Sequence, residues 1–165
     1  MKSLAIFGAV VLLQAAGCGG NNTPDAGNAG ACADTTAAEY KCDGATSVKT
    51  GELWTNVINP KCVSTCHNAT GSAVSYGNYS TAALFQSQNV TVKSLYAGSK
   101  GTFKKVDPNA LQNSSVWLKV IGGSGASRKG PQCESPGNAM PDGLPALTDA
   151  EKTQIKNWIC TGATE

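Results

Sequence analysis

The chain has 165 residues, a formal net charge of +2 at pH 7 and only 15% charged residues. This nearly neutral composition excludes the pervasive basic character of nucleic-acid-binding domains, and the length suits one small domain. The 19 glycines favour a loop-rich fold with few long helices.

Residues 1–17 predict an export signal. The apolar run 4–13 is too short to span a bilayer, but it suits the core of a secretory signal peptide. The run leads into AAGC, which resembles the processing site of bacterial lipoproteins, whose cysteine is lipidated and becomes the first mature residue. Here that cysteine is Cys18. The alternative is an ordinary signal peptide cut near Ala16, which would leave Cys18 as a plain thiol.

Residues 19–31 (GGNNTPDAGNAGA) contain no large apolar side chain. Such a segment cannot bury enough surface to offset its chain entropy, so we expect a flexible tether. A lipid anchor followed by a tether would hold a folded domain at the periplasmic or outer-surface face of a bacterial membrane. We therefore divide the chain into a signal (1–17), a lipidated tether region (18–50) and a folded domain (51–165).

A short helix is expected over 52–58, where apolar residues form one stripe, and Pro60 is expected to end it. The sequence CVSTCH follows, from Cys62 to His67, and His67 is the only histidine in the chain. A cysteine pair followed by histidine is the attachment pattern of c-type haem. The thiols of Cys62 and Cys66 would form thioether bonds to the haem, and the imidazole would ligate its iron.

The motif departs from the common form, because three residues rather than two separate its cysteines. The extra residue has to bulge before both sulfurs can reach the haem vinyl groups. A disulfide between Cys62 and Cys66 is one alternative, and a zinc site that recruits other cysteines is another.

Export places the cysteines in an oxidising compartment, where they become oxidised or modified. Beyond Cys18 and the two motif cysteines, four remain, and they allow three pairings. We favour the local pairing, in which Cys32–Cys42 closes a small loop within 18–50 and Cys133–Cys160 ties the C-terminal region. In the alternative, Cys42 pairs with Cys160 and joins the two ends of the domain.

Two short helices and a turn are expected in the middle of the chain. The helices are expected over 81–88 and over 114–121, the second with Ser114 as cap and Gly122-Gly123 as stop. The turn is expected at 107–109. The segment 93–132 has a local charge of +6. Its basic residues are Lys93, Lys100, Lys104, Lys105, Lys119, Arg128 and Lys129, and its one acid is Asp107. If they gather near the cofactor, they would steer an acidic redox partner; scatter over the surface is the alternative.

Met140 is the only methionine that remains after signal removal. It lies in a loop, directly before Pro141, and a thioether sulfur is a recognised second axial ligand of c-type haem. The alternative is a methionine that fills a gap in the core. The last helix is expected to begin at the capping box Thr148-Asp149-Ala150-Glu151 and to stop at Gly162. Its buried stripe would consist of Ile155, Trp158 and Ile159.

Together, the helix, CVSTCH, the MP loop and the ending TDAEKTQIKNWI resemble class I cytochrome c over residues 51–163. The resemblance implies an all-α domain with short helices and long loops around one covalent haem c. It implies that Cys62 and Cys66 hold the haem, that His67 and Met140 ligate the iron, and that the first and last helices pack together.

The resemblance also implies a function. A membrane-anchored monomer would carry single electrons between redox protein partners, and it would not be an enzyme, because a His/Met iron has no open position for a substrate. The alternative is a haem-free, disulfide-stapled surface lipoprotein with a binding or structural role.

Overall fold

The computed structural model describes residues 32, 34–95, 103–122 and 127–165. Helices make up the regular structure of these residues, which form isolated β-bridges but no strand. The α-helices are α1 (Thr50–Leu53), α2 (Ala82–Asn89), α3 (Ser115–Ile121) and α4 (Asp149–Cys160). Single 3₁₀ turns lie at η1 (Ala38–Tyr40), η3 (Val74–Tyr76) and η5 (Leu111–Asn113). The expected all-α class with short helices and long loops is confirmed for this part of the chain.

The first helix is longer than the sequence predicts. α1 runs directly into a π-helix, η2 (Trp54–Val63), so the helical path starts at Thr50 and continues past Pro60. The expectation of a helix over 52–58 that ends before Pro60 is therefore wrong. Pro60 supplies no N–H, but the Ser64 N–H donates to the Asn59 carbonyl at 3.3 Å in the wider i→i+5 pattern. The chain stays helical because its hydrogen bonds shift by one residue.

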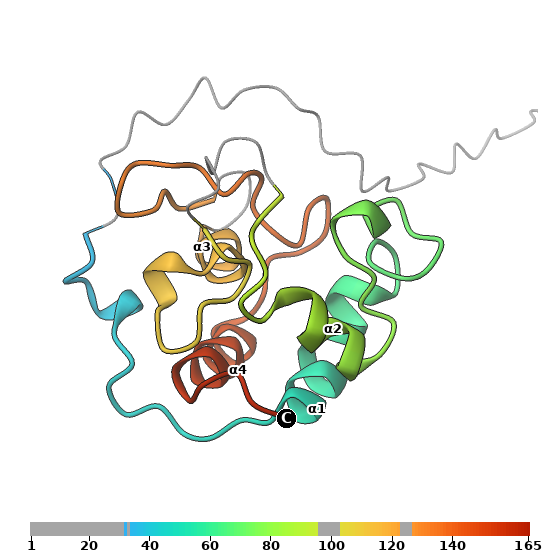
Figure 1. The fold of residues 1–165 in the computed structure, drawn as a ribbon, viewed down its shortest axis with the longest axis horizontal. Helices are drawn as coiled ribbons and strands as arrows, with labels where there is room; N and C mark the ends of the chain where they lie inside the picture. The colour runs from blue at the N-terminus through green and yellow to red at the C-terminus, as the bar shows by residue number, and fades with distance from the viewer. Residues whose placement is uncertain (1–31, 33, 96–102, 123–126) are drawn as a thin grey trace, which may run out of the picture.

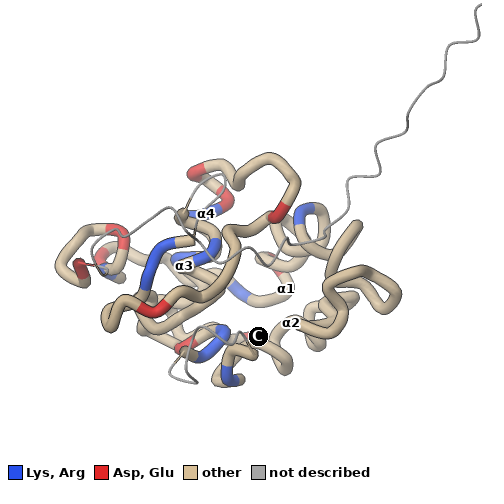
Figure 2. The backbone as a smooth tube through the Cα atoms, turned by 90° about the horizontal axis from the view of Figure 1, so that it is seen from above, with Lys and Arg blue, Asp and Glu red and all other residues tan. Residues whose placement is uncertain are grey.

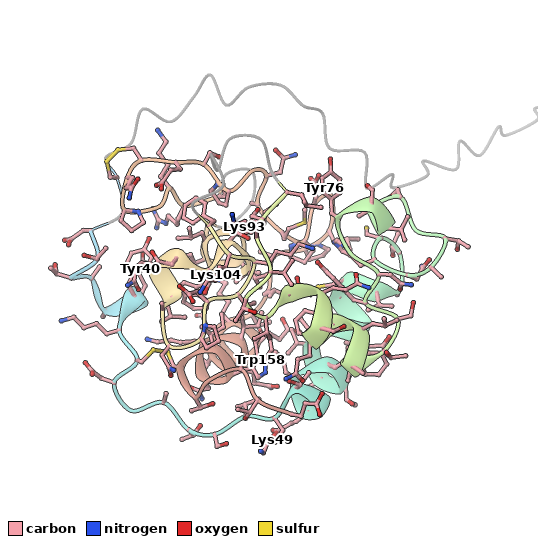
Figure 3. The ribbon with its side chains drawn as sticks, in the orientation of Figure 1. Tyr40, Lys49, Tyr76, Lys93, Lys104 and Trp158 are labelled. Atoms are coloured by element: carbon pink, nitrogen blue, oxygen red, sulfur yellow. A yellow bond between two sulfur atoms is a disulfide. The ribbon has the colours of Figure 1, made fainter. Side chains whose placement is uncertain are left out.

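The start of α4 is where the sequence predicts it. The Thr148 hydroxyl accepts from the Glu151 N–H at 3.3 Å, and the Glu151 carboxylate accepts from the Thr148 N–H at 2.8 Å. This capping box satisfies two N–H groups that a bare helix end leaves without partners. The buried face consists of Ile155, Trp158 and Ile159, as expected. Figure 3 shows Trp158 in the interior, between α4 and α2.

The packing of the first helical segment against the last is confirmed. Leu53 and Val57 are 0% exposed and lie in the same apolar cluster as the buried face of α4. The Trp158 Nε1–H donates to the Thr50 hydroxyl at 2.9 Å. The backbone N–H of Thr50 donates to the Thr164 carbonyl at 3.0 Å, so the C-terminus lies beside α1 (Figure 1).

The two middle helices form close to their predicted ranges. α2 follows Thr81, whose hydroxyl accepts from the Leu84 N–H at 3.2 Å. Ser114 precedes α3, but its side chain does not cap that helix. Instead, the Ser114 hydroxyl accepts from the Asp107 N–H at 2.8 Å and donates to the Ala110 carbonyl at 2.9 Å. It therefore fixes the turn that precedes α3.

Between residues that the structure describes, disulfides join Cys42 to Cys160 and Cys32 to Cys133. The favoured local pairing is wrong, and no small disulfide loop closes within residues 18–50; the alternative Cys42–Cys160 bridge is confirmed. The reason is the path of the segment before α1, which no sequence pattern revealed.

That segment lies along α4 and belongs to the folded domain. Tyr40 and Val48 are 7% and 6% exposed and are part of the core. The Lys156 ammonium donates to the Ala38 carbonyl at 3.1 Å, and the Asn157 amide donates to the Thr46 hydroxyl at 2.8 Å. The folded part therefore begins before the predicted boundary at residue 51.

Replacing Cys42 and Cys160 together by alanine is expected to lower the free energy of unfolding by about 2–5 kcal/mol. The bridge spans 118 residues of sequence, so its loss frees a large part of the unfolded chain. Urea unfolding of the double variant and the wild type measures the difference. Thr46→Ala is the matched control, because it removes one exposed contact between the same segments, a loss of about 1 kcal/mol at most. A double variant as stable as the control would contradict the expectation.

No helix in the described part of the chain combines the length and the apolar character needed to cross a membrane. The predicted signal 1–17 and the tether 19–31 lie outside the described residues.

Candidate cofactor-binding site

One cavity of about 370 Å³ brings together the four side chains that the sequence analysis proposed as haem-binding residues. Cys62, Cys66 and His67 reach it from the end of η2 and the turn that follows, and Met140 reaches it from the loop before α4. Apolar side chains from several elements form much of the remaining wall: Ile58, Phe85, Val116, Val120, Leu147 and Ile155. A cavity of this size with a mainly apolar wall and a few convergent polar groups is typical of cofactor sites.

The structure accommodates the three-residue spacing of the cysteines through a π-type turn. The His67 N–H donates to the Cys62 carbonyl at 2.9 Å, which is an i→i+5 hydrogen bond. Such a bond encloses one residue more than the i→i+4 bond of an α-helix. The extra residue of CVSTCH therefore fits within one turn, and His67 still follows Cys62 by one turn.

His67 is buried and held in one tautomer. Its Nδ1 lies 2.9 Å from the Gly77 carbonyl oxygen, which can only accept, so Nδ1 carries the proton and Nε2 carries the free lone pair. Burial lowers the pKa of His67, and the hydrogen bond to Gly77 opposes this shift only in part. The imidazole is therefore neutral at pH 7, which is the form that ligates a metal.

The loop from 68 to 79 folds back over the motif. The Ala73 N–H donates to the Cys66 carbonyl at 3.0 Å, and the Tyr79 N–H donates to the His67 carbonyl at 2.7 Å. Gly77 has φ +153°, and a Cβ there would overlap the ring of Tyr79. Glycine is therefore needed where the Tyr79 ring crosses the loop.

Sequence reasoning missed Gly77, Tyr79 and Asn89 as parts of this site. Gly77 and Tyr79 lie in a region with no clear helical or strand period, and Asn89 follows the helix predicted over 81–88, so no sequence signal pointed to this site. The Tyr79 ring stacks on the His67 ring, and its hydroxyl donates to the Asn89 side chain.

The two motif cysteines differ in state. Cys62 is a free thiol, and burial together with the nearby Glu151 carboxylate raises its pKa to about 12, so it keeps its proton. Cys66 is disulfide-bonded, though not to Cys62, so the Cys62–Cys66 disulfide considered from the sequence does not form. A disulfide at Cys66 and a thioether at Cys66 exclude each other, because the sulfur makes only one such bond.

Met140 contacts both the cavity and the core. It is half-buried, lines the cavity and packs against the apolar cluster. Its backbone N–H donates to the Lys119 carbonyl at 3.1 Å, which ties the methionine loop to α3.

Three lysines also line the cavity, and one of them, Lys61, pairs with Glu151 at 3.3 Å. The other two are Lys105 and Lys119. The Lys105 ammonium donates to the Tyr76 carbonyl at 2.6 Å. Burial lowers the pKa of both Lys105 and Lys119, that of Lys119 to about 8, although the Asp142 carboxylate opposes the shift at Lys119. Two cations at a mainly apolar cavity suit a ligand that carries carboxylates.

The other described basic residues of the 93–132 segment are partly neutralised. Lys104 pairs with Asp107 at 2.7 Å, and the Arg128 guanidinium lies 4.0 Å from Glu39. Figure 2 shows the described basic positions on several separate stretches of the backbone. Lys100 lies outside the described residues.

The structure thus brings Cys62, Cys66, His67 and Met140 to one cavity, whereas Cys18 lies outside the described residues. In the part of the chain that the structure covers, no group of three or more His, Cys, Asp or Glu side chains could hold a metal ion. No protein-family model, no curated protein and no solved structure matches the chain.

Proposed function

We propose that this chain is a membrane-anchored c-type cytochrome of the class I type, which carries single electrons between redox proteins of a bacterial envelope. The observation that carries the proposal is the meeting of two cysteines, a histidine and a methionine at one mainly apolar cavity. These are the groups that a covalent haem with His/Met ligation requires. The chain offers no second histidine.

With Cys66 released from its disulfide, the chemistry of the donor set would fit one haem c. Nδ1 of His67 is engaged in the hydrogen bond to the Gly77 carbonyl, so Nε2 would be the ligating nitrogen. The Met140 thioether would be the second ligand, and Lys105 and Lys119 would pair with the haem carboxylates. The bound haem would supply an iron that cycles between the ferric and ferrous states.

The protein's own contribution would be to ligate, orient and exclude water. Apolar side chains of the cavity wall such as Phe85 and Val120 would shield the bound haem from water, and a Met ligand favours the ferrous state. Two protein ligands leave no open position for a substrate, so we propose an electron carrier rather than an enzyme.

A direct test is expression in a bacterium that has the haem-attachment machinery, followed by denaturation of the purified protein. We expect haem absorbance that stays with the denatured chain, because thioether bonds survive unfolding. The double variant Cys62→Ala, Cys66→Ala should lose it, whereas Thr65→Ala, an exposed substitution within the same motif, should keep it. A colourless wild type, from cells that load a control cytochrome, would contradict the proposal.

The disulfide at Cys66 favours a second candidate function. In that state Cys66 has no thiol for a haem, and the protein would be haem-free and disulfide-stapled, with a binding or structural role. Its cavity would then take an apolar ligand with a carboxylate, held by Lys105 and Lys119. The same test separates the two candidates, because only the cytochrome is coloured.

The membrane anchor is proposed to be the lipidated Cys18. Replacing Cys18 by serine is expected to release the protein from the membrane fraction, because it removes the lipidated residue. Several acyl chains bind a membrane stably, whereas one chain binds it only marginally. Fractionation of cells followed by immunoblotting measures the release. Asn22→Ser in the neighbouring tether is the control and should stay in the membrane fraction. A Cys18→Ser protein that sediments fully with membranes would place the anchor elsewhere.

A further inference from the structure

We propose that Tyr79 is a positioning residue for His67, and that Asn89 holds Tyr79 in place. Tyr79 and Asn89 would thereby fix the plane of the axial imidazole and influence the reduction potential. The inference rests on the proposed function, because it concerns the imidazole that would ligate the haem iron.

The contact between the two rings is close and nearly parallel. The centroids of His67 and Tyr79 lie 4.4 Å apart, and the ring planes differ by 13°. The Nδ1–H bond to the Gly77 carbonyl fixes one edge of the imidazole, and the Tyr79 ring covers one of its faces. A rotation of the imidazole about its bond to Cβ would break the hydrogen bond and the stacking together, so the two contacts select one orientation.

Tyr79 is itself held at both ends. Its backbone carbonyl accepts from the Trp54 Nε1–H at 2.8 Å, and its hydroxyl donates to the Asn89 side-chain oxygen at 3.0 Å. Phe85 meets the Tyr79 ring edge-on, with the centroids 5.3 Å apart. The ring therefore has little freedom to tilt away from His67.

Asn89 connects this arrangement to α2. It is 0% exposed, and its amide donates to the Phe85 carbonyl at 2.6 Å, one turn earlier in the helix. Burying an amide and a phenol is costly unless they are paired, and here each satisfies the other. A phenylalanine at 79 would fill the same space but would need no polar partner. The hydroxyl of Tyr79 therefore serves to orient the ring through Asn89 rather than to fill the core.

The groups that orient a metal-ligating histidine affect both its geometry and its basicity. A stacked and immobile imidazole would present Nε2 in one direction and keep water from its covered face. Loss of the stack would let the ring rotate and let water approach the iron, which stabilises the ferric state. We therefore expect Tyr79→Leu to lower the reduction potential and to broaden the electron paramagnetic resonance signal of the ferric protein.

The experiment uses the full mature chain, released from the membrane by Cys18→Ser and loaded with haem. Tyr79→Leu removes the stacking, Tyr79→Phe removes only the hydroxyl, and Tyr40→Phe is a control at a buried tyrosine that does not line the cavity. The proposal predicts a clear shift of the potential and of the ferric signal for Tyr79→Leu, a smaller shift in the same direction for Tyr79→Phe, and none for Tyr40→Phe. Tyr79→Leu with a wild-type potential and signal would overturn it. If Tyr79→Leu does not fold, Tyr79→Phe tests the hydroxyl contact with Asn89 alone, and a wild-type potential and signal in that variant would overturn the proposal that Asn89 holds Tyr79 in place.

A second measurement separates this inference from the proposed function. Nitrogen-15 NMR of the haem-free chain reports the tautomer of His67, with no need for the cofactor. We expect a single Nδ1–H tautomer in the wild type and a mixture in Tyr79→Leu. A wild type that never binds haem would refute the proposed function, and the tautomers would still decide whether Tyr79 positions His67. An unchanged tautomer in Tyr79→Leu would overturn the positioning role.

Discussion

Replacing His67 by alanine is expected to reduce covalently attached haem by more than about tenfold. Residues that only contact a metal ligand already change metal affinity or activity by about 10–100-fold when they are mutated, and His67 is proposed to be the ligand itself. His67 is the only histidine, it lines the cavity, and its Nδ1–H bond to Gly77 leaves Nε2 for the iron. Under the proposed function, haem attachment would depend on this imidazole. Haem absorbance per mole of denatured protein measures the effect.

The control for this substitution is Thr65→Ala, which lies in the same motif but is exposed. Circular dichroism shows whether the His67→Ala chain still folds, and added imidazole should restore part of the haem spectrum by entering the space left by the side chain. A His67→Ala protein with full haem and an unchanged spectrum would show that another group ligates the iron.

Replacing Met140 by alanine is expected to leave the haem attached and to lower the reduction potential. The proposed thioether bonds would involve Cys62 and Cys66, so attachment would not depend on the methionine. A thioether ligand favours the ferrous state, and axial ligands span about 0.8 V in haem proteins, so we expect a fall on the order of 0.1–0.3 V. The weak long-wavelength band of an iron–sulfur bond should disappear as well. Potentiometric titration and the ferric spectrum measure the two effects.

Leu144→Ala is the matched control for Met140→Ala. Leu144 lies in the same loop and lines the same cavity, but it has no sulfur. A lysine is the competing ligand for the iron, and in the described structure Lys119 lines the cavity whereas Lys129 does not. A Met140→Ala protein with the potential and the band of the wild type would show that Met140 is not the second ligand.

The parts of the fold that the sequence predicted well are those that local chemistry determines. The capping box of α4 needs only Thr148 and Glu151 at the right spacing, and the buried stripe that contains Trp158 follows from the helical period. The assignment of the four proposed haem-binding residues rests on residue type and spacing, and it stays a prediction. Their meeting at one cavity depends on the fold of the whole domain.

The features that the sequence did not predict depend on the path of the folded chain. Pro60 usually marks a helix end, and the i→i+5 bonds that carry η2 past it have no simple sequence signal. The pairing of Cys42 with Cys160 follows from the segment before α1, which lies along α4. The contact of Tyr79 with His67 requires a loop that turns back over the motif, and no sequence pattern indicated that turn.

The most direct test of the central claim is the mass of the purified mature chain, measured under denaturing, non-reducing conditions and followed by peptide mapping. The cytochrome proposal predicts an added mass of one haem, located on the peptide that contains both Cys62 and Cys66. A haem-free mass, with Cys66 in a disulfide and Cys62 open to alkylation, in cells that load a control cytochrome, would contradict it.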